Sequence, residues 1–399
     1  MLPAVGELQV LLQAPSEIRG EGRITVARKT LTGMELYHRL WGGPLRMVVP
    51  PGNGGAGGLG EEVVDTRQLP FVIDVLDMSS PELRERVKRA AVVLGGANHD
   101  LNGLARHCRK LGVPYAFNCE YSLNTRWQIA LADLPKGTRL LRRMAWEAQQ
   151  EVANLREVTG ARAVQCNGTP TYDLYRHINS NALLYFDTRT EQSMLATHEQ
   201  VSARIARRAS GKPLRLLFSG RLAPMKGADD LPKLARVLRD RGVPFHLDIC
   251  GGGSLEETMK AEIERAGLSS HVTFHGVLDF ATELMPLVRD EIDLFVCPHR
   301  QGDPSCTYLE TFACGVSIIG YANEAFVGLL QRADVGESVP INDVEGLASL
   351  VERFARPESL AVFERMSKAA LALAREHTFE TTFARRIEHL RSIARVNVA

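Results

Sequence analysis

The fold of this chain is constrained most by the alternation of short apolar segments with stretches of helical periodicity. In the first half, the segments that suit buried strands are LQVLLQ (8–13), LRMVVP (45–50), FVIDVLD (71–77), AAVVLGG (90–96) and PYAFN (114–118). In the second half, they are LRLLFSG (214–220), FHLDICG (245–251), HVTFHG (271–276), IDLFVCP (292–298) and VSIIGY (316–321). Short apolar strands that alternate with helices form parallel sheets covered on both faces. The pattern predicts an α/β protein with two Rossmann-like domains facing a cleft, where ligands bind at the carboxyl ends of strands.

The region 189–212 separates the two halves, because it is charged, lacks a strand pattern and ends in Ala-Ser-Gly-Lys-Pro. We place the two domains at residues 1–195 and 213–375, joined by a linker at 196–212. The connection 189–212 and the C-terminal helix are expected to serve as hinge elements. Residues 376–399 follow the second domain.

The composition, with 45% hydrophobic and 24% charged residues, is typical of a soluble globular protein. The formal net charge is +1, so overall charge gives no reason to expect a nucleic-acid partner. The seven cysteines are scattered without a CxxC or a His/Cys cluster, which favours reduced thiols in a cytoplasmic protein and no metal site. The start, MLPAVGELQVLLQAP, has neither a positive region nor a long apolar run, so we expect no signal peptide and no transmembrane helix.

Two long helices are predicted in the first half, from about Ile24 to Leu40 and from about Thr138 to Glu157. Apolar side chains recur every three or four positions in the second of these helices, at Leu141, Met144, Ala148, Val152 and Leu155.

The start of this second helix also has a basic amphipathic character. Arginines accompany apolar residues there, at Arg139, Leu140, Leu141, Arg142, Arg143 and Trp146. Such a face either packs on the core with its arginines in solvent or rests on an anionic membrane surface. In the second case the protein would be peripheral at the inner face of the membrane.

Two loops that follow strands of the second half carry groups suited to a binding site. In SGRLAPMKG (219–227), Arg221 and Lys226 lie just past Gly220. Two cations beside a glycine turn suit a diphosphate, although a solvated basic loop has the same pattern. In CGGGSLEE (250–257), three consecutive glycines either let the backbone approach a ligand or form a permissive turn before a helix.

A third loop opens the segment QGDPSCTYLETFACG (301–315). Asp303 before Pro304 fits an N-cap followed by proline, and Gly315 fits a C-terminal stop, so we predict a helix over 304–313. Free amides at its N-terminus favour a phosphate. Glu310 lies about six residues further, roughly 9 Å along the helix axis, where a carboxylate can accept hydrogen bonds from both hydroxyls of a ribose. The alternative is a surface glutamate on an exposed face.

These three loops bring out a family resemblance. The segments LRLLFSGRLAPMKGADDL, LDICGGGSLEETMKAEIERAGLSSHVTFHGVL and PSCTYLETFACGVSIIGY resemble, in order and spacing, the donor half of glycosyltransferase family 4. The resemblance covers about residues 212–345. It implies a GT-B enzyme of hexosyltransferase type, retaining and independent of a metal, that acts in polysaccharide or glycolipid assembly.

The resemblance also implies roles for individual residues. Arg221 and Lys226 would hold the diphosphate of a nucleotide sugar, Glu310 would hold its ribose, and the backbone at Val277 and Leu278 would contact the base. The further donor-side candidates are Gly220, Gly251, Gly252, Ser305, Cys306 and Thr307.

The final segment, HTFETTFARRIEHLRSIARV, is similar to the last helix of the family. Residues 376–399 are therefore expected to cross back onto the N-terminal domain, which would bind a saccharide or glycolipid acceptor.

The sequence departs from the family pattern at Gly302, where the family motif has its first glutamate, eight residues before the second. Asp-Pro-Ser-Cys-Thr replaces the usual glycine-phenylalanine-glycine stretch. Asp303 then either supplies the missing carboxylate to the transferred sugar or only caps the helix.

The first half resembles the family less. Gly20 and Gly22 lie where the glycine loop of the family approaches the diphosphate. His99 and Asp100 follow one strand and Glu120 follows another, so these three are candidates on the acceptor side, with His99 also a catalytic candidate. A lone histidine of this kind is otherwise structural, and Asp100 can also cap the next helix.

Two alternatives remain at this stage. GNGGAG (52–57) fits the dinucleotide pattern GxGxxG and is followed by Asp77, which suggests an NAD(P)-dependent oxidoreductase. Against it, glycines crowd the segment 52–60 between Pro51 and Pro70, which favours a loop on the acceptor side. Gly302 motivates the other alternative, a GT-B module that binds nucleotide sugars without transferring the sugar.

Overall fold

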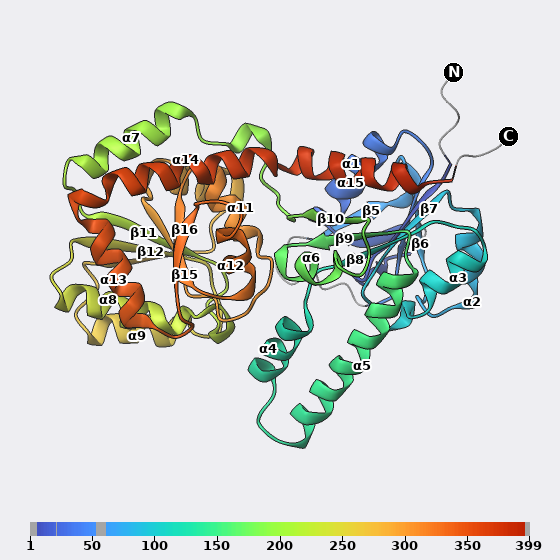
Figure 1. The fold of residues 1–399 in the computed structure, drawn as a ribbon, viewed down its shortest axis with the longest axis horizontal. Coiled ribbons are helices and arrows are strands. Elements are labelled where there is room, and N and C mark those ends of the chain that lie inside the picture. The colour runs from blue at the N-terminus through green and yellow to red at the C-terminus, as the bar shows by residue number, and fades with distance from the viewer. Residues whose placement is uncertain (1–5, 21, 53–60, 396–399) are drawn as a thin grey trace. The chain divides into compact units, whose positions relative to one another are not determined.

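The computed structural model describes residues 6–20, 22–52 and 61–395, and the chain divides into two compact units (Figure 1). The first unit comprises the chain up to Leu123, Leu141–Tyr185 and the segment from Glu380 onward. The second unit comprises Asn124–Leu140 and Phe186–Phe379. The predicted boundary near residue 195 differs from this division, because residues 124–140 and 186–195 group with the second unit.

A seven-stranded parallel sheet forms the centre of the first unit, in the order β10-β9-β8-β7-β1-β4-β6. Its strands are β1 (Leu8–Leu11), β4 (Leu45–Val49), β6 (Val72–Val75), β7 (Val92–Gly96), β8 (Tyr115–Cys119), β9 (Ala163–Asn167) and β10 (Ala182–Tyr185). Val10 of β1 pairs with Met47 on one side and with Leu94 on the other, and all three are buried. The five strands predicted in this half are confirmed. Strands β9 and β10 were not predicted. Gln165 and Asn167 interrupt the apolar pattern of β9, and β10 is only four residues long.

The helices of the first unit are α1 (Arg28–Trp41), α2 (Pro81–Arg86), α3 (Leu104–Lys110), most of α5 (Thr138–Gly160), α6 (Thr169–Tyr175) and α15 (Phe379–Ile393). One buried cluster joins the sheet to these helices, with Val93 and Phe117 from the strands, Leu83 from α2, Leu104 from α3 and Val158 from α5.

The helix predicted from Ile24 begins later, at Arg28. Residues Arg23–Ala27 instead form β3, which pairs antiparallel with β2 (Glu17–Ile18) and β5 (Glu61–Asp65) in a small separate sheet. The β-branched run in Ile-Thr-Val suits a strand better than a helix, which explains the error.

Helix α5 turns a different face inward from the one its apolar periodicity suggests. Leu141 is 67% exposed and Val152 is 49% exposed, whereas Glu157 is buried. The Glu157 carboxylate accepts hydrogen bonds from the amides of Gly103 and Ala105, at 2.7 and 2.8 Å, at the start of α3. The Glu157 carboxylate can be buried because it accepts hydrogen bonds from amides that have no partner within α3 itself.

A six-stranded parallel sheet forms the centre of the second unit, in the order β13-β12-β11-β14-β15-β16. Its strands are β11 (Leu214–Ser219), β12 (Phe245–Cys250), β13 (Val272–Gly276), β14 (Leu294–Cys297), β15 (Ser317–Tyr321) and β16 (Gly336–Val339). The five strands predicted here are confirmed. Strand β16 was not predicted, because its sequence, Gly-Glu-Ser-Val, carries almost no apolar signal.

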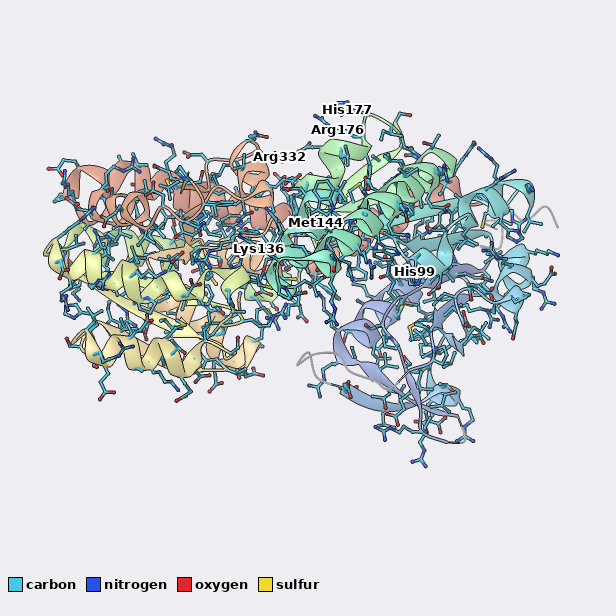
Figure 2. The ribbon with its side chains drawn as sticks, turned by 90° about the horizontal axis from the view of Figure 1, so that it is seen from below. His99, Lys136, Met144, Arg176, His177 and Arg332 are labelled. Carbon is cyan, nitrogen blue, oxygen red and sulfur yellow. The ribbon has the colours of Figure 1, made fainter. Side chains whose placement is uncertain are left out.

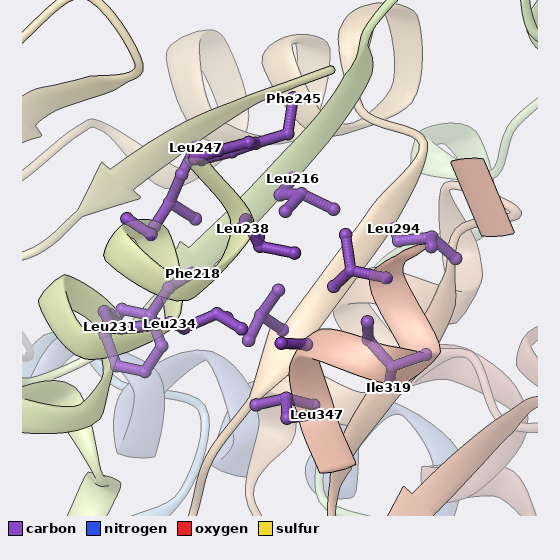
Figure 3. Packing of buried hydrophobic residues seen from close by; sticks show 14 of the residues in the cluster. Leu216, Phe218, Leu231, Leu234, Leu238, Phe245, Leu247, Leu294, Ile319 and Leu347 are labelled. Carbon is purple, nitrogen blue, oxygen red and sulfur yellow. The ribbon is translucent and has the colours of Figure 1, made fainter. Parts of the chain in front are cut away.

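Helices cover both faces of this second sheet (Figure 1). The helices of the second unit are α4 (Leu123–Asp133, from Asn124 on), α7 (His198–Ala209), α8 (Leu231–Asp240), α9 (Glu256–Arg265), α10 (Met285–Glu291), α11 (Cys306–Ala313), α12 (Glu324–Leu330), α13 (Val344–Ala355) and α14 (Leu360–Glu376). The helical spacing of Leu231, Leu234 and Leu238 places them on one face of α8, where they pack with Leu216 and Phe218 of β11 (Figure 3).

The segment predicted as a linker, 196–212, contains α7 and belongs to the second unit. Thr197 and Gln200 form a capping box at its start. Arg204 is buried and donates to the carbonyl oxygens of Cys314 and Gly315, at 2.8 and 2.7 Å, at the end of α11. The charged sequence is thus an ordered helix, because its central arginine satisfies carbonyls of its neighbour.

The C-terminal helices confirm the expected crossing. Helix α14 belongs to the second unit, whereas α15 belongs to the first from Glu380 on. The ring of Phe383 lies 5.0 Å from that of Tyr37, and the guanidinium of Arg391 donates to the carbonyl of Trp41, both on α1. Across the described ranges, the helices lack the combination of length and apolarity that a membrane span needs.

Candidate functional site

Three loops of the second unit follow the adjacent strands β12, β11 and β14. Since these strands run parallel and pair in register, their carboxyl ends meet at one edge of the sheet. The loops span residues 251–255, 220–230 and 298–305. They carry the donor-side candidates Gly220, Arg221, Lys226, Gly251, Gly252, Asp303 and Ser305.

Lys226 ends a short helical turn, Pro224–Lys226, in the loop after β11, and it is buried. The next residue, Gly227, has a φ of +64°, and a Cβ there would lie 1.9 Å from the carbonyl oxygen of Pro298. The close approach of these two loops therefore requires glycine and holds Lys226 against the loop after β14. Arg221, in contrast, is exposed.

Asp303 pairs with Lys226 and does not cap the helix. Its two carboxylate oxygens lie 2.9 and 3.2 Å from the Lys226 Nζ atom. Helix α11 begins at Cys306 with Ser305 at the N-cap position, and no side chain caps it. The predicted cap at Asp303, with Pro304 as the first helical residue, is therefore wrong. The carboxylate is instead drawn to the buried ammonium, which needs a counter-charge.

Glu310 is buried in α11, as its apolar neighbours suggest, but its partner is a residue that the sequence did not reveal. The Arg189 Nε atom donates to the Glu310 carboxylate at 2.8 Å, and the guanidinium lies 3.9 Å above the ring of Phe280. This ion pair raises the pKa of Arg189, against the opposing effect of its burial. Arg189 thus satisfies Glu310, and its charged, unpatterned surroundings gave no signal.

The three consecutive glycines let two protein backbones approach each other. A Cβ on Gly251 would lie 2.0 Å from the carbonyl oxygen of Gly220, and one on Gly253 would lie 2.5 Å from that of Leu222. Both glycines also have φ values in the range that disfavours other residues. The need for glycine at these two positions thus comes from packing between the first two loops. The neighbours of Gly252 are farther, at 3.4 Å or more.

Gly302 is enclosed by α4 and α12. Its amide donates to the Gln128 Oε1 atom at 2.9 Å, and its carbonyl accepts from the Thr125 hydroxyl at 3.0 Å. A Cβ on Gly302 would lie 2.8 Å from the Cβ of Glu324 and 3.3 Å from the Thr125 hydroxyl. A larger side chain does not fit at this position.

Two further polar side chains of this loop are buried. His299 is 1% exposed and Gln301 is 4% exposed. Within the described part of the chain, neither ring nitrogen of His299 nor the Gln301 Oε1 atom has a hydrogen-bond partner. Burial, followed by the positive charge of Lys226, lowers the pKa of His299 well below its ordinary value. His299 is therefore neutral at physiological pH. It was not among the predicted site residues.

The remaining donor-side candidates are more open. Val277, which follows β13, is 81% exposed, and Leu278 is half-buried. A Cβ on Gly252 would lie 3.6 Å from a methyl group of Val277. The glycine loop after β12 and the residue predicted to contact the base are therefore neighbours.

Ser305, Cys306 and Thr307 form the start of α11. The Ser305 hydroxyl donates to that of Thr307 at 3.2 Å, and the Cys306 thiol lies 3.9 Å from a carboxylate oxygen of Asp187.

The acceptor-side candidates belong to the first unit. His99 is exposed in a short turn after β7, 3.3 Å from a carboxylate oxygen of Asp100, and its ring lies edge-on to Trp146 at 5.9 Å (Figure 2). Asn98 caps this turn through the Asp100 amide. The next helix, α3, has Gly103 at its N-cap position, so the suggested capping role of Asp100 is wrong. Glu120 is exposed directly after β8.

Gly20 and Gly22 lie in the hairpin turn between β2 and β3. Their φ values are +101° and +72°, and the amide of Arg23 donates to the Gly20 carbonyl at 3.0 Å. The hairpin itself therefore accounts for both glycines.

The comparisons with known proteins agree with this geometry. Residues 202–371 match the model of the family Glycosyl transferases group 1. The putative colanic acid biosynthesis glycosyltransferase WcaL of Salmonella typhimurium is 25% identical over 155 residues, which cover 37% of this chain and 38% of WcaL. The phosphatidyl-myo-inositol mannosyltransferase of Mycolicibacterium smegmatis is 28% identical over 168 residues, or 41% of each chain. The chain thus spans about two fifths of the length of these curated relatives.

Solved structures share the fold over nearly the whole chain. Anabaena HepE in complex with UDP and glucose superposes with a TM-score of 0.64 at 12% identity, covering 97% of this chain and 99% of HepE. Sucrose-phosphate synthase from Thermosynechococcus elongatus gives a TM-score of 0.60 at 14% identity, covering 97% and 98%. The chain therefore has the α/β fold of the GT-B glycosyltransferases, with two Rossmann-like domains.

Proposed function

We propose that this protein is a glycosyltransferase of family 4, of hexosyltransferase type. It transfers a sugar from a nucleoside diphosphate sugar to a saccharide or glycolipid acceptor with retention of the anomeric configuration. The observation that carries the proposal is the gathering of Lys226, Asp303 and Glu310 on two neighbouring loop-and-helix connections, inside the region that matches a glycosyltransferase family.

The donor site follows from the chemistry of these groups. Lys226 and Arg221 would bind the diphosphate, because one ammonium and one guanidinium complement its charge. Glu310 would accept hydrogen bonds from the two ribose hydroxyls, and Val277 and Leu278 would border the base. Asp303 lies beside Lys226, where it would face the junction between the diphosphate and the sugar.

The proposed reaction needs a stabilised leaving diphosphate. As the bond from the sugar to the diphosphate breaks, negative charge grows on the leaving oxygen, and Lys226 and Arg221 would neutralise it. That oxygen can accept the proton of the attacking acceptor hydroxyl. We propose that no metal is required, so chelation with EDTA should leave turnover unchanged.

The acceptor side is proposed for the first unit, with His99, Asp100 and Glu120 as candidate contacts. Gly20 and Gly22 stay candidates for contact with the donor. A cytoplasmic location is part of the same proposal.

A thermal-shift screen of nucleotide sugars on the purified protein tests the proposal, followed by measurement of sugar transfer and donor hydrolysis. At least one donor should raise the melting temperature by several degrees and should be turned over. No stabilisation by any nucleotide sugar, together with no turnover, would contradict it.

A non-catalytic GT-B module is the second candidate, because Gly302 leaves no room for a side chain where the family has a glutamate. It predicts donor binding without hydrolysis or transfer. The dinucleotide motif at 52–57 lies, from residue 53 on, outside the described residues, and the comparisons do not favour an oxidoreductase.

A further inference from the structure

Helix α4 is part of the donor unit although its sequence lies between β8 and α5 of the first unit. It contacts the loop after β14 at Gly302, where Thr125 and Gln128 hold both backbone polar groups of the glycine. We call these two hydrogen bonds the α4 clamp. A third contact supports the clamp, because the Asn124 side chain donates to the Glu324 carboxylate on α12 at 3.3 Å.

The clamp acts directly on Asp303. The carbonyl held by the Thr125 hydroxyl belongs to the peptide that joins Gly302 to Asp303. On the other side, the Asp303 carbonyl accepts from the Ser305 amide at 2.9 Å. With both flanking peptides fixed, the Asp303 side chain has little freedom except at its own torsions. Its carboxylate is thereby kept against Lys226, at 2.9 Å.

A fixed carboxylate beside the phosphate-binding lysine distinguishes two ligands that share a diphosphate. In a nucleoside diphosphate sugar both phosphates are esterified and carry one charge each. The free nucleoside diphosphate ends in a terminal phosphate, whose second ionisation has a pKa of about 6, as in phosphorylated side chains. It therefore carries nearly one more negative charge at neutral pH, and a nearby carboxylate repels it more strongly.

We propose that α4 holds Asp303 as a charge filter at Lys226, which favours binding of a nucleoside diphosphate sugar over the free nucleoside diphosphate. This inference rests on the proposed function, in which Lys226 binds the diphosphate. It assigns Thr125 and Gln128 as positioning residues and gives Asp303 a role in donor selectivity. In the reaction it would promote release of the diphosphate product, because the extra charge appears only after the sugar has left.

The test is titration calorimetry with two matched pairs of probes, UDP with UDP-glucose and GDP with GDP-mannose. The pair that the wild type binds is then used for all variants. Asp303→Asn should raise the affinity for the free nucleoside diphosphate on the order of tenfold and should change the affinity for the nucleotide sugar much less. A reduced or unchanged affinity of Asp303→Asn for the free diphosphate would overturn the charge filter.

The role of α4 is tested with Thr125→Val, which keeps the shape but loses the donated hydrogen bond, and with Thr125→Ser as the matched control. Thr125→Val should raise the affinity for the free nucleoside diphosphate to a value between those of the wild type and Asp303→Asn. Thr125→Ser should bind it with the wild-type affinity. A purely structural role would weaken both ligands together. Equal behaviour of Thr125→Val and Thr125→Ser would overturn the positioning role.

The two proposals fail in different ways. If the wild type binds none of the four probes and no other nucleotide sugar, the proposed function falls and this inference falls with it. If the wild type binds a donor but the variants do not change the preference for the sugar form, only the charge filter is lost.

Discussion

Glu310 is a buried carboxylate whose partner in the structure is Arg189, and we propose that a ribose is its second partner when a donor binds. Its partner Arg189 is 42% exposed, whereas the Glu310 side chain is 10% exposed, so the acid depends on the pair more than the base does. The arginine also has the ring of Phe280 beneath it. In the proposed complex, Arg189 would therefore release one carboxylate oxygen of Glu310 to the ribose and keep its contact with Phe280.

Removing the charge of Glu310 should lower stability, since Arg189 loses its counter-charge. We expect Glu310→Gln to cost about 1 kcal/mol in the free energy of unfolding, and a double-mutant cycle with Arg189→Gln to show a coupling of similar size. Urea unfolding of the four proteins measures both. In addition, 2′-deoxy-UDP should bind the wild type more weakly than UDP, and Glu310→Gln should remove this difference. Additive losses in unfolding would show that Glu310 and Arg189 are not coupled. Additive losses in the comparison of UDP with 2′-deoxy-UDP would show that Glu310 does not contact the 2′-hydroxyl.

His299 should make stability depend on pH. Its pKa is lowered in the folded protein, so the unfolded state binds the extra proton first as the pH falls. The stability it confers is complete above the unfolded-state pKa of about 6.5 and declines below it, by at most about 1.4 kcal/mol per pH unit. Between about pH 7.5 and about pH 5.5, the wild type should therefore lose about 1 kcal/mol more in urea unfolding than His299→Gln.

The matched control for this measurement is His177→Gln, because His177 is exposed in the first unit (Figure 2). It should show the pH dependence of the wild type. Parallel curves for wild type and His299→Gln would contradict the account of a buried neutral histidine.

Helix α7 shows why a charged segment without strand pattern is not necessarily a linker. Its apolar contacts are few, but Arg204 also donates to the Arg289 carbonyl, at 2.6 Å, besides the two carbonyls at the end of α11. Three orphan carbonyl groups of two helices are thus satisfied by a single guanidinium. Desolvation lowers the pKa of Arg204 to about 10, which still leaves it charged at neutral pH.

Replacing this arginine should therefore destabilise the protein strongly. We expect Arg204→Met to cost about 3 kcal/mol in urea unfolding, because three buried carbonyls lose a charged donor. Arg265→Met, at an exposed site on α9, is the control and should change stability by less than about 0.5 kcal/mol. Similar losses in both variants would mean that the buried hydrogen bonds of Arg204 contribute little.

The elements of the two sheets could largely be predicted from the sequence, because buried parallel strands are continuous apolar runs. Strands β9, β10 and β16 escaped prediction. Gln165 and the polar start of β16 hide the apolar signal in two of them, and β10 is only four residues long. The site was harder. Motif spacing pointed to Lys226 and Glu310 as candidates, but not to Arg189, because its contact with Glu310 joins positions 121 residues apart. Asp303 before Pro304 looks like a cap, and only the position of Lys226 shows that it is not.

At the scale of the whole molecule, the grouping of residues 124–140 with the second unit could not be foreseen. The hydrogen bonds that hold this segment connect α4 to Gly302, and nothing in the local sequence of α4 encodes them. The membership of a separate stretch of chain in a unit is decided by long-range contacts. Sequence patterns indicate the periodicity of a helix or strand but not these contacts.

Helix α5 gives the molecule a candidate membrane surface. Leu141 is 67% exposed and Trp146 is 38% exposed, and Arg139 and Arg142 are exposed near them, whereas Leu140 is buried. We propose peripheral contact with anionic lipid through this face. Flotation should show binding to phosphatidylserine vesicles at low salt that weakens as salt is added, and Arg139→Ser with Arg142→Ser should reduce it.

The control for flotation is the pair Arg356→Ser and Arg365→Ser, which removes two exposed arginines of the second unit. It should float as the wild type does. No binding of the wild type at low salt would rule out the membrane surface. An equal loss of vesicle binding in both double variants would show that binding depends on overall charge and not on this face of α5.

We propose that the Lys226 ammonium binds the diphosphate of a nucleotide sugar and stabilises its departure. The direct measurement is the rate of sugar transfer or donor hydrolysis by Lys226→Met, compared with the wild type and with the control Lys260→Met on the exposed face of α9. At matched melting temperature or after correction for folded fraction, Lys226→Met should be slower by about 100-fold or more, equivalent to about 3 kcal/mol, while Lys260→Met keeps the wild-type rate. A wild-type rate in Lys226→Met would contradict the account.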